Sequence, residues 1–358
     1  MSNENSYKKA NAITKQGFKD QVSKMAELVG ATIPKDADFT REKRGVYNQS
    51  ISLDTVKEFI SNRGMRISDR MIRRYHLSLI NKGFVILSGI SGTGKTWLAE
   101  LYAEAIGAKK LVVPVAPNWT SNEDLLGFYN PLDNEYKHTE FSKFLMEAQD
   151  EYVASLQEKR QPVPYHIILD EMNLARVEYY FAKFLSLLEV KGRNEEVYID
   201  IPPKDRIILT PNLFFIGTIN VDETTQSFAD KVYDRAQLIE VEISREEIKA
   251  ALGAEEYSDV IMEIWDTVFE VAPFAYRVIG DLKKYIEDAE KVGQSWNVAL
   301  DEQVLQKILP KIKGTDLEIG GKLEELKIIL DRANLELSTE KVNKMLERYA
   351  RYGVASYF

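Results

Sequence analysis

Residues 84–96, FVILSGISGTGKT, decide the fold of this chain. The apolar run at residues 84–87 is typical of a buried parallel strand, and residues 97–106, WLAELYAEAI, are typical of a helix. Between them, residues 89–96 match the pattern G-x-x-x-x-G-K-[ST] in full. A strand, a glycine-rich loop and a helix in this order predict a loop that wraps phosphate groups.

The residue types of this loop suit a triphosphate. Glycines allow positive φ, which turns successive N–H groups toward an anion, and the N-terminus of the next helix adds partial positive charge. Lys95 is predicted to reach the β- and γ-phosphates, and the Thr96 hydroxyl to ligate Mg²⁺. The residues predicted to surround the nucleotide are Gly89, Ser91, Gly92, Thr93, Gly94, Lys95, Thr96 and Trp97. An ordinary glycine-rich turn is the alternative, and the Lys-Thr pair with both flanks in place argues against it.

A second apolar run ends in two acids. Residues 166–169, HIIL, are followed by Asp170 and Glu171. Open parallel sheets bind ligands at the C-terminal ends of their strands. Asp170 is therefore predicted to hold Mg²⁺, directly or through water, and Glu171 to polarise the attacking water. We interpret Asn173, shortly after, as an ordinary helix cap.

Strand-like and helix-like segments alternate through the middle of the chain. Further apolar runs of strand length occur at residues 111–115, 213–219 and 238–243. Segments of helical pattern occur at residues 95–106, 141–157 and 177–190. This alternation predicts crossover connections and a parallel sheet covered by helices on both faces, which is a three-layer α/β fold.

The pattern divides the chain into three regions. Residues 1–80 are predicted to be a helical N-terminal region or linker, residues 81–244 the α/β nucleotide-binding domain, and residues 245–358 a helical C-terminal domain. Strand signals stop after residue 244. Helical patterns then occur at residues 245–252, 258–271, 276–291, 301–312, 321–333 and 339–351.

The N-terminal region is basic. It holds 15 Lys and Arg against 9 Asp and Glu, a net charge of +6, so the other 278 residues carry −15. Its helical patterns lie at residues 17–29, 54–61 and 68–80, with a linker at residues 30–50. Four arginines three or four apart are predicted to share a helix face: Arg66, Arg70, Arg73 and Arg74. Such a face either contacts nucleic acid or an acidic partner subunit, or is an ordinary solvated surface.

Composition excludes several kinds of site. The chain has 358 residues, 44% of them hydrophobic and 29% charged, and a formal net charge of −9. It has no Cys, which excludes disulfides, zinc–thiolate sites and a cysteine nucleophile, and its three His argue against a His-rich metal site. No apolar run approaches the ~20 residues of a membrane-spanning helix, and the polar start does not resemble a signal peptide. We therefore expect a cytoplasmic protein without membrane contact.

The chain resembles the AAA+ ATPase superfamily and, within it, the McrB branch, the motor subunits of McrBC-type modification-dependent restriction systems. The resemblance covers roughly residues 80–358. It is carried by GISGTGKT (89–96), NEDLLGFYNPL (122–132), HIILDEMNLARVEYYFAKFLSLLE (166–189), GTINVDETTQSFADKVYDRA (217–236), FAYRVIGDL (274–282), QKILPKIKG (306–314) and KVNKMLERYARYGVASYF (341–358). The segment TINVDETT is the most specific of these.

The resemblance implies roles for further residues. Asn220 resembles the polar residue that helps to place the attacking water. Arg235 resembles an arginine that reaches into the nucleotide of a neighbouring subunit, and Lys231 is a second candidate for that contact. Arg277 resembles the arginine that couples the C-terminal lid domain to the nucleotide, and the role of Asp222 is open. The ordinary alternatives are an Asn turn, a local ion pair at Arg235 and an unspecific helix arginine.

Residues 118–129 follow the second predicted strand. In similar proteins this region lies toward the central channel or the subunit interface. Trp119, Phe128 and Tyr129 either contact a partner or a threaded chain, or pack beneath the loop.

The implied function is a Mg²⁺-dependent motor that hydrolyses GTP or ATP as a ring, expected to be hexameric. It would drive a McrC-like nuclease subunit in restriction or antiphage defence, with DNA contacted indirectly or through that partner. The region before residue 80 shows neither a zinc motif nor an aromatic base-binding signature. Two alternatives are open: a MoxR-like AAA+ chaperone that remodels a protein complex, and a nucleotide-gated switch, against which Glu171 argues.

Overall fold

The computed structural model describes residues 19–20, 22–23, 26, 32–33, 51–189, 198–201, 205–221, 226–315 and 317–358. The chain divides into two compact units. One comprises Met1–Ser88 and Lys95–Val241, and the other comprises Gly89–Gly94 and Glu242–Phe358. The second unit therefore includes the glycine-rich loop, which the sequence assigns to the α/β domain.

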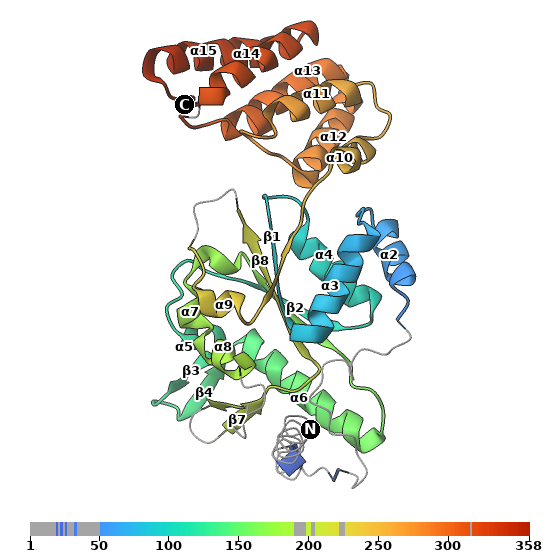
Figure 1. Ribbon diagram of the computed structural model, residues 1–358, viewed down its shortest axis with the longest axis vertical. Coiled ribbons are helices and arrows are strands. Elements are labelled where there is room, and N and C mark those ends of the chain that lie inside the picture. The colour runs from blue at the N-terminus through green and yellow to red at the C-terminus, as the bar shows by residue number, and fades with distance from the viewer. Residues whose placement is uncertain are drawn as a thin grey trace, which may run out of the picture. The chain divides into compact units, whose positions relative to one another are not determined.

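The first unit is built on a five-stranded parallel sheet with the strand order β2-β5-β8-β1-β9 (Figure 1). The strands are β1 (Phe84–Gly89), β2 (Lys109–Pro114), β5 (Tyr165–Asp170), β8 (Leu213–Asn220) and β9 (Gln237–Glu240). Each contains or overlaps one of the predicted apolar runs. The predicted α/β fold with a parallel sheet is confirmed.

Alternate residues of each central strand face opposite layers of helices, as the period of two in a strand requires. Phe84 and Ile86 of β1 belong to one apolar core, and Val85 and Leu87 belong to the other. The first core is covered by α5 (Asn122–Leu126), α6 (Glu140–Glu158), α7 (Val177–Tyr180) and α8 (Ala182–Glu189). The second is covered by α2 (Leu53–Asn62), α3 (Asp69–Lys82) and α4 (Lys95–Ala105).

The structure differs from the prediction in the connections between these elements. The helix predicted at residues 177–190 is interrupted at Phe181, whose φ of −110° and ψ of 12° are not helical. Two antiparallel hairpins were not predicted, because each strand has four residues and the alternation of apolar residues is weak. They are formed by β3 (Gly127–Asn130) with β4 (Glu135–His138), and by β6 (Tyr198–Ile201) with β7 (Asp205–Ile208).

The N-terminal region contributes helices to the first unit. Residues 19, 20, 22, 23 and 26 are helical, and the rest of the helix predicted at 17–29 lies outside the described residues. Val22 and Ala26 are buried against Tyr152, Val153, Leu156 and Ile208. The linker predicted at 30–50 also lies outside the described residues, apart from 32 and 33.

The second unit is helical and has its own apolar core. Its helices are α10 (Arg245–Leu252), α11 (Ser258–Val268), α12 (Tyr276–Lys291), α13 (Trp296–Gln303), α14 (Leu317–Arg332) and α15 (Glu336–Tyr352). The helix predicted at residues 301–312 is instead the end of α13, a π-helical turn at Val304–Ile308 and a 3-10 turn at Leu309–Lys311. Pro310 explains the ending, because a proline lacks the N–H that a continuing helix needs.

No helix among the residues that the structure describes is long and apolar enough to cross a membrane.

A buried carboxylate joins α13 to α15. Asp301 is 5% exposed, and its carboxylate accepts hydrogen bonds from the N–H groups of Leu337 and Ser338 at 2.7 and 2.8 Å. These N–H groups lie in the first turn of α15, where no helical carbonyl can accept from them. Asp301 therefore acts as a cap supplied from another helix.

We expect Asp301→Ala to lower the free energy of unfolding by about 1–3 kcal/mol, because it leaves two N–H groups at the start of α15 without an acceptor. Chemical denaturation measures this change. The matched control is Asp331→Ala, since Asp331 is an exposed acid near the end of α14. Equal unfolding midpoints for the two variants would contradict the capping role.

Candidate functional site

The C-terminal end of β5 carries the acid around which the site is organised. The Asp170 carboxylate oxygen Oδ1 accepts a hydrogen bond from the Thr96 hydroxyl at 2.5 Å and another from the Thr218 hydroxyl at 2.7 Å. Thr96 lies in the first turn of α4 and Thr218 lies on the neighbouring strand β8. Two strands and one helix therefore converge on a single carboxylate oxygen.

Glu171 follows directly in a left-handed conformation, with φ 52° and ψ 48°. This conformation is uncommon for a residue with a side chain and ends the strand abruptly. The Glu171 N–H donates to the Thr218 hydroxyl at 3.0 Å, and the Asn220 amide donates to the Glu171 carboxylate oxygen Oε1 at 3.2 Å. The Glu171 carboxylate is thereby held at the tip of β8, next to Asn220.

Thr218 was not singled out from the sequence. It lies two residues before Asn220, so the two side chains project from the same face of β8. That period of two is the signal that could have identified it. Gly217, between them along the strand, faces the opposite side of β8, where a Cβ would lie 2.5 Å from the Met172 sulfur and would force that side chain to move.

The basic residue of the phosphate-loop motif is buried. Lys95 is the first residue of α4 and is only 5% exposed. A lysine at such a position is expected to carry its charge toward an anion. Trp97, predicted to lie near the nucleotide, is 40% exposed on the same helix.

The glycine-rich loop Gly89–Gly94 belongs to the helical unit. Gly92 and Gly94 have φ of 83° and 85°, the left-handed values expected for a phosphate cradle. The Arg277 N–H donates to the Gly92 carbonyl at 3.3 Å, and a Cβ on Gly92 would lie 3.1 Å from the Arg277 Cβ. The backbone of Arg277 is thus fixed beside the loop, while its side chain is exposed.

Two other loop residues pack inward. The Thr93 hydroxyl donates to the Ile90 carbonyl at 3.1 Å, and Ile90 lies against the apolar core of the helical unit. Their side chains therefore shape the loop, and its backbone is the part suited to contact phosphate.

The two candidates for a contact across a subunit boundary lie in and just after α9 (Asp230–Tyr233). Arg235 is half-buried, and its guanidinium donates to the backbone carbonyls of Leu185 at 2.8 Å and Lys231 at 2.6 Å. The Lys231 side chain is exposed. The predicted roles of both in a neighbouring nucleotide site stay predictions.

The structure also bears on the predictions for Asn173 and Asp222. Asn173 is not a helix cap: it is 6% exposed and lies inside the 3-10 turn Met172–Leu174, because Glu171 already ends the strand and starts that turn. Its carbonyl accepts the Gln226 N–H at 3.0 Å. Asp222 lies outside the described residues.

The aromatic residues of the segment 118–129 divide between the two interpretations. Trp119 packs edge-on against Tyr180, with ring centroids 5.3 Å apart. Phe128, on β3, is 56% exposed.

The turn before α5 is fixed by Asp124, whose carboxylate accepts hydrogen bonds from the N–H groups of Thr120 and Ser121 at 2.8 Å each. These hydrogen bonds hold the pKa of Asp124 below its ordinary value.

The donor set fits Mg²⁺. Thr96 and Asp170 present two oxygens side by side, and Mg²⁺ prefers oxygen ligands supplied by one or two side chains together with substrate phosphates. No group of three or more His, Asp and Glu that could hold a metal occurs among the described residues. The ion would therefore depend on the phosphates of the nucleotide for the rest of its coordination.

Comparison with known proteins identifies the class. Residues 84–236 match the family model described as AAA domain (dynein-related subfamily). This part of the chain is an AAA+ ATPase domain, a class that hydrolyses nucleoside triphosphates and generally uses Mg²⁺ and ATP. Residues 241–354 match a model described as Domain of unknown function (DUF8727).

The comparisons with curated proteins and with solved structures do not show a family. None of the curated proteins matches this sequence. Among solved structures, the chain is similar to a mutant of RuvB from Thermotoga maritima, with 14% identity over 66% of this chain and 69% of that chain and a TM-score of 0.41.

The hydroxyl of Thr218 provides a direct test of the site. We expect Thr218→Val to reduce nucleotide turnover roughly 10- to 100-fold, because it removes the donor to Asp170 and the acceptor of the Glu171 N–H while keeping side-chain shape. Steady-state hydrolysis and nucleotide-binding titrations separate turnover from affinity, which should change little.

The matched control is Thr210→Val. Thr210 is also buried, at 4% exposure, but it precedes β8 at the opposite end of the strand from Asn220. The same loss of turnover in both variants would mean that Thr218 acts only through stability.

Proposed function

We propose that the chain is an NTP-driven ring motor of the McrB type that powers a McrC-type nuclease subunit in restriction of foreign DNA. The observation that carries the proposal is the connected set of hydrogen bonds from Thr96 through Asp170, Thr218 and Glu171 to Asn220. A site built only for nucleotide binding does not need Glu171 and Asn220 in this arrangement. The particular branch is supported by the sequence resemblance.

Each residue has a distinct part in hydrolysis. Lys95 and the loop amides bind the phosphates. Thr96 and Asp170 would hold Mg²⁺, which would neutralise phosphate charge when bound. Glu171 accepts the proton of the attacking water as the new oxygen–phosphorus bond forms and the bond from the γ-phosphorus to the bridging oxygen breaks, with the nucleoside diphosphate as leaving group. Asn220 donates to Glu171 and so fixes the orientation of that carboxylate.

A ring assembly would give Arg235 a function that the nucleotide site of a single subunit does not give it. Developing negative charge on the γ-phosphate would be stabilised by an arginine from the next subunit, as an arginine finger supplied in trans does in other phosphate-transferring enzymes. Arg235 supplies this cation in the proposal. It would exchange its hydrogen bonds to the carbonyls of Leu185 and Lys231 for the phosphate.

Glu171→Gln tests hydrolysis. We expect turnover to fall by about 10²- to 10⁴-fold while nucleotide affinity is kept, because the amide cannot accept the proton. Hydrolysis is measured with ATP and with GTP side by side, each with and without the protein encoded by the neighbouring gene. A neighbouring nuclease that raises turnover supports the motor, whereas unchanged turnover in Glu171→Gln contradicts our assignment of the base.

The action of Arg235 across subunits can be tested by mixing variants. Arg235→Ala and Glu171→Gln should each be inactive alone. A 1:1 mixture should recover up to about a quarter of wild-type turnover, because a quarter of random ring interfaces pair an intact Glu171 with an intact Arg235. Mixing Lys231→Ala with Glu171→Gln tests the second candidate, and inactive mixtures that still assemble would contradict action in trans.

A further inference from the structure

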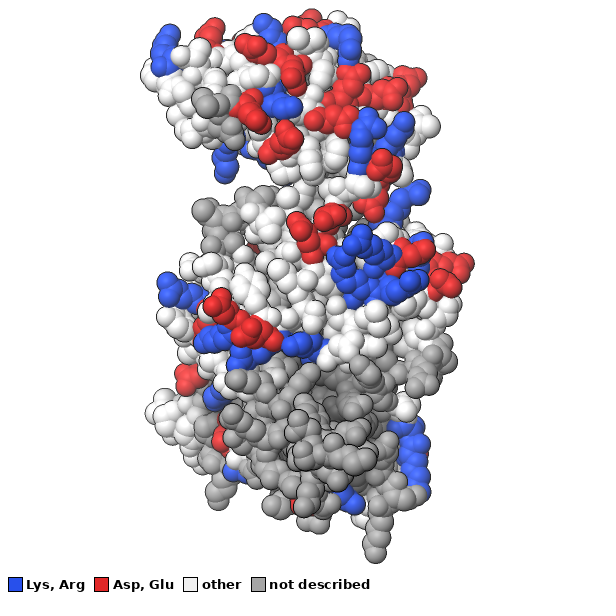
Figure 2. All heavy atoms as spheres, in the orientation of Figure 1, with Lys and Arg blue, Asp and Glu red and all other residues white. Residues whose placement is uncertain are grey.

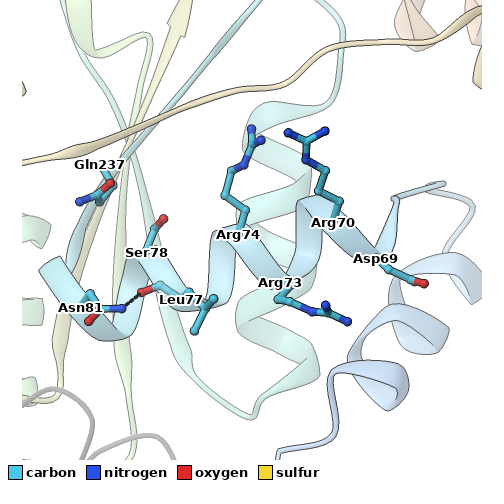
Figure 3. A pocket seen from close by; sticks show the side chains of 8 residues that line it. All are labelled: Asp69, Arg70, Arg73, Arg74, Leu77, Ser78, Asn81 and Gln237. Carbon is cyan, nitrogen blue, oxygen red and sulfur yellow. Dashed lines mark hydrogen bonds between the residues drawn. The ribbon is translucent and has the colours of Figure 1, made fainter.

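An open groove runs along the exposed side of α3 in the first unit (Figure 3). Three arginines of α3 line it: Arg70, Arg73 and Arg74. Arg70 and Arg74 extend from the helix in the same direction, and Asp69 points away from them (Figure 3). Arg66, predicted to share this face, lies before the helix, because the Ser68 side chain caps α3.

These arginines are all exposed, and none forms an ion pair with a residue that the structure describes. The Asp69 carboxylate is bound to Lys57 and interacts with Arg73 only through its charge, without an ion pair. Other exposed arginines do have carboxylate partners, for example Arg63 with Glu104. Figure 2 shows Lys and Arg side chains gathered over α3, with Asp and Glu side chains beside them. A group of exposed arginines without ion pairs gives this groove a local positive charge, although the whole chain carries a net charge of −9, and such a charge attracts anions.

The other groups in the groove are polar. Ser78 and Asn81 continue the line of Arg70 and Arg74 along α3, and Gln237 lines the groove from β9. From Arg70 to Arg74 the helix rises about 6 Å, a length over which one strand of duplex DNA carries about two phosphates. Arg70 and Arg74 can therefore bind neighbouring phosphates of one strand, while Arg73 points in another direction (Figure 3).

We propose that this groove binds the phosphate backbone of nucleic acid without reading its sequence. Arginine suits phosphate because its planar guanidinium donates two parallel hydrogen bonds. Contacts to phosphate position a protein and carry no sequence information, so binding through these arginines is expected to be alike for unrelated sequences. The proposal is independent of NTP hydrolysis and adds a direct contact with nucleic acid to the proposed motor.

An acidic protein partner fits the groove less well. Protein interfaces have an apolar, often aromatic centre, whereas interfaces with DNA are more polar and positively charged. Leu77, 47% exposed, is the apolar side chain among the residues that line the groove. A protein partner would find little surface to bury there.

The test is binding of the full chain, without nucleotide, to fluorescently labelled 25-base-pair duplexes of two unrelated sequences. The variant is the triple substitution Arg70→Ala, Arg73→Ala and Arg74→Ala. At 100 mM salt we expect its affinity to fall roughly 10- to 100-fold for both sequences, and the slope of log K against log[salt] to fall by about 2.7, or 0.9 for each lost contact. A triple Arg→Lys variant should keep most of the slope, because it keeps the charge.

The matched control removes three exposed positive charges of the helical unit: Lys284→Ala, Arg348→Ala and Arg351→Ala. It should bind within about twofold of wild type, because the effect is local to the groove. Three results would each overturn the proposal. The first is an equal loss of DNA affinity in the α3 Arg→Ala variant and in the control variant, and the second is no binding of wild type at 50 mM salt. The third is a loss of self-association in the α3 Arg→Ala variant without a loss of DNA affinity. NTP hydrolysis measured in parallel should be unchanged in the α3 variant, so that failure of this proposal is distinguishable from failure of the motor.

Discussion

The site depends on one shared carboxylate oxygen. Asp170 accepts hydrogen bonds from the hydroxyls of Thr96 on a helix and Thr218 on the adjacent strand, so it fixes the distance between the two elements. The same Thr218 hydroxyl accepts the Glu171 N–H, and this links the metal-binding acid to the predicted base. A half-buried network of this kind is rigid when each member has its partner, and catalysis by positioning requires that rigidity.

Much of this arrangement could be predicted, because it follows from strands that end in polar residues. Asp170 and Glu171 were identified as the end of a buried apolar run, and parallel strands bring such ends to one edge. Asn220 directly follows the run at residues 213–219, and its role was implied by the resemblance. The left-handed turn at Glu171 could not be foreseen, because it reflects the hydrogen bond to Thr218 and not a preference of glutamate. A pairwise contact of this kind has no signature in residues 166–171 alone.

The short hairpins show another limit of sequence patterns. The β3–β4 hairpin depends on close approach at Gly127, where a Cβ would lie 2.0 Å from the Lys137 carbonyl oxygen, and on the hydrogen bond from the Tyr136 hydroxyl to the Gly127 carbonyl at 2.6 Å. These are tertiary contacts that four-residue strands cannot encode by alternation. The role proposed for Arg235 is even harder to predict from sequence patterns, because its proposed ligand belongs to another subunit.

The outermost strands of the sheet limit how copies of the chain can associate. β2 carries Lys109 and Lys110 and ends at Pro114, which has no N–H to offer, and β9 at the other border has only four residues. Charged side chains, proline and brevity are the features by which natural sheets avoid continuing into a neighbour. These features disfavour joining of two copies through strand addition at either border, so a contact between copies would more readily use side-chain surfaces.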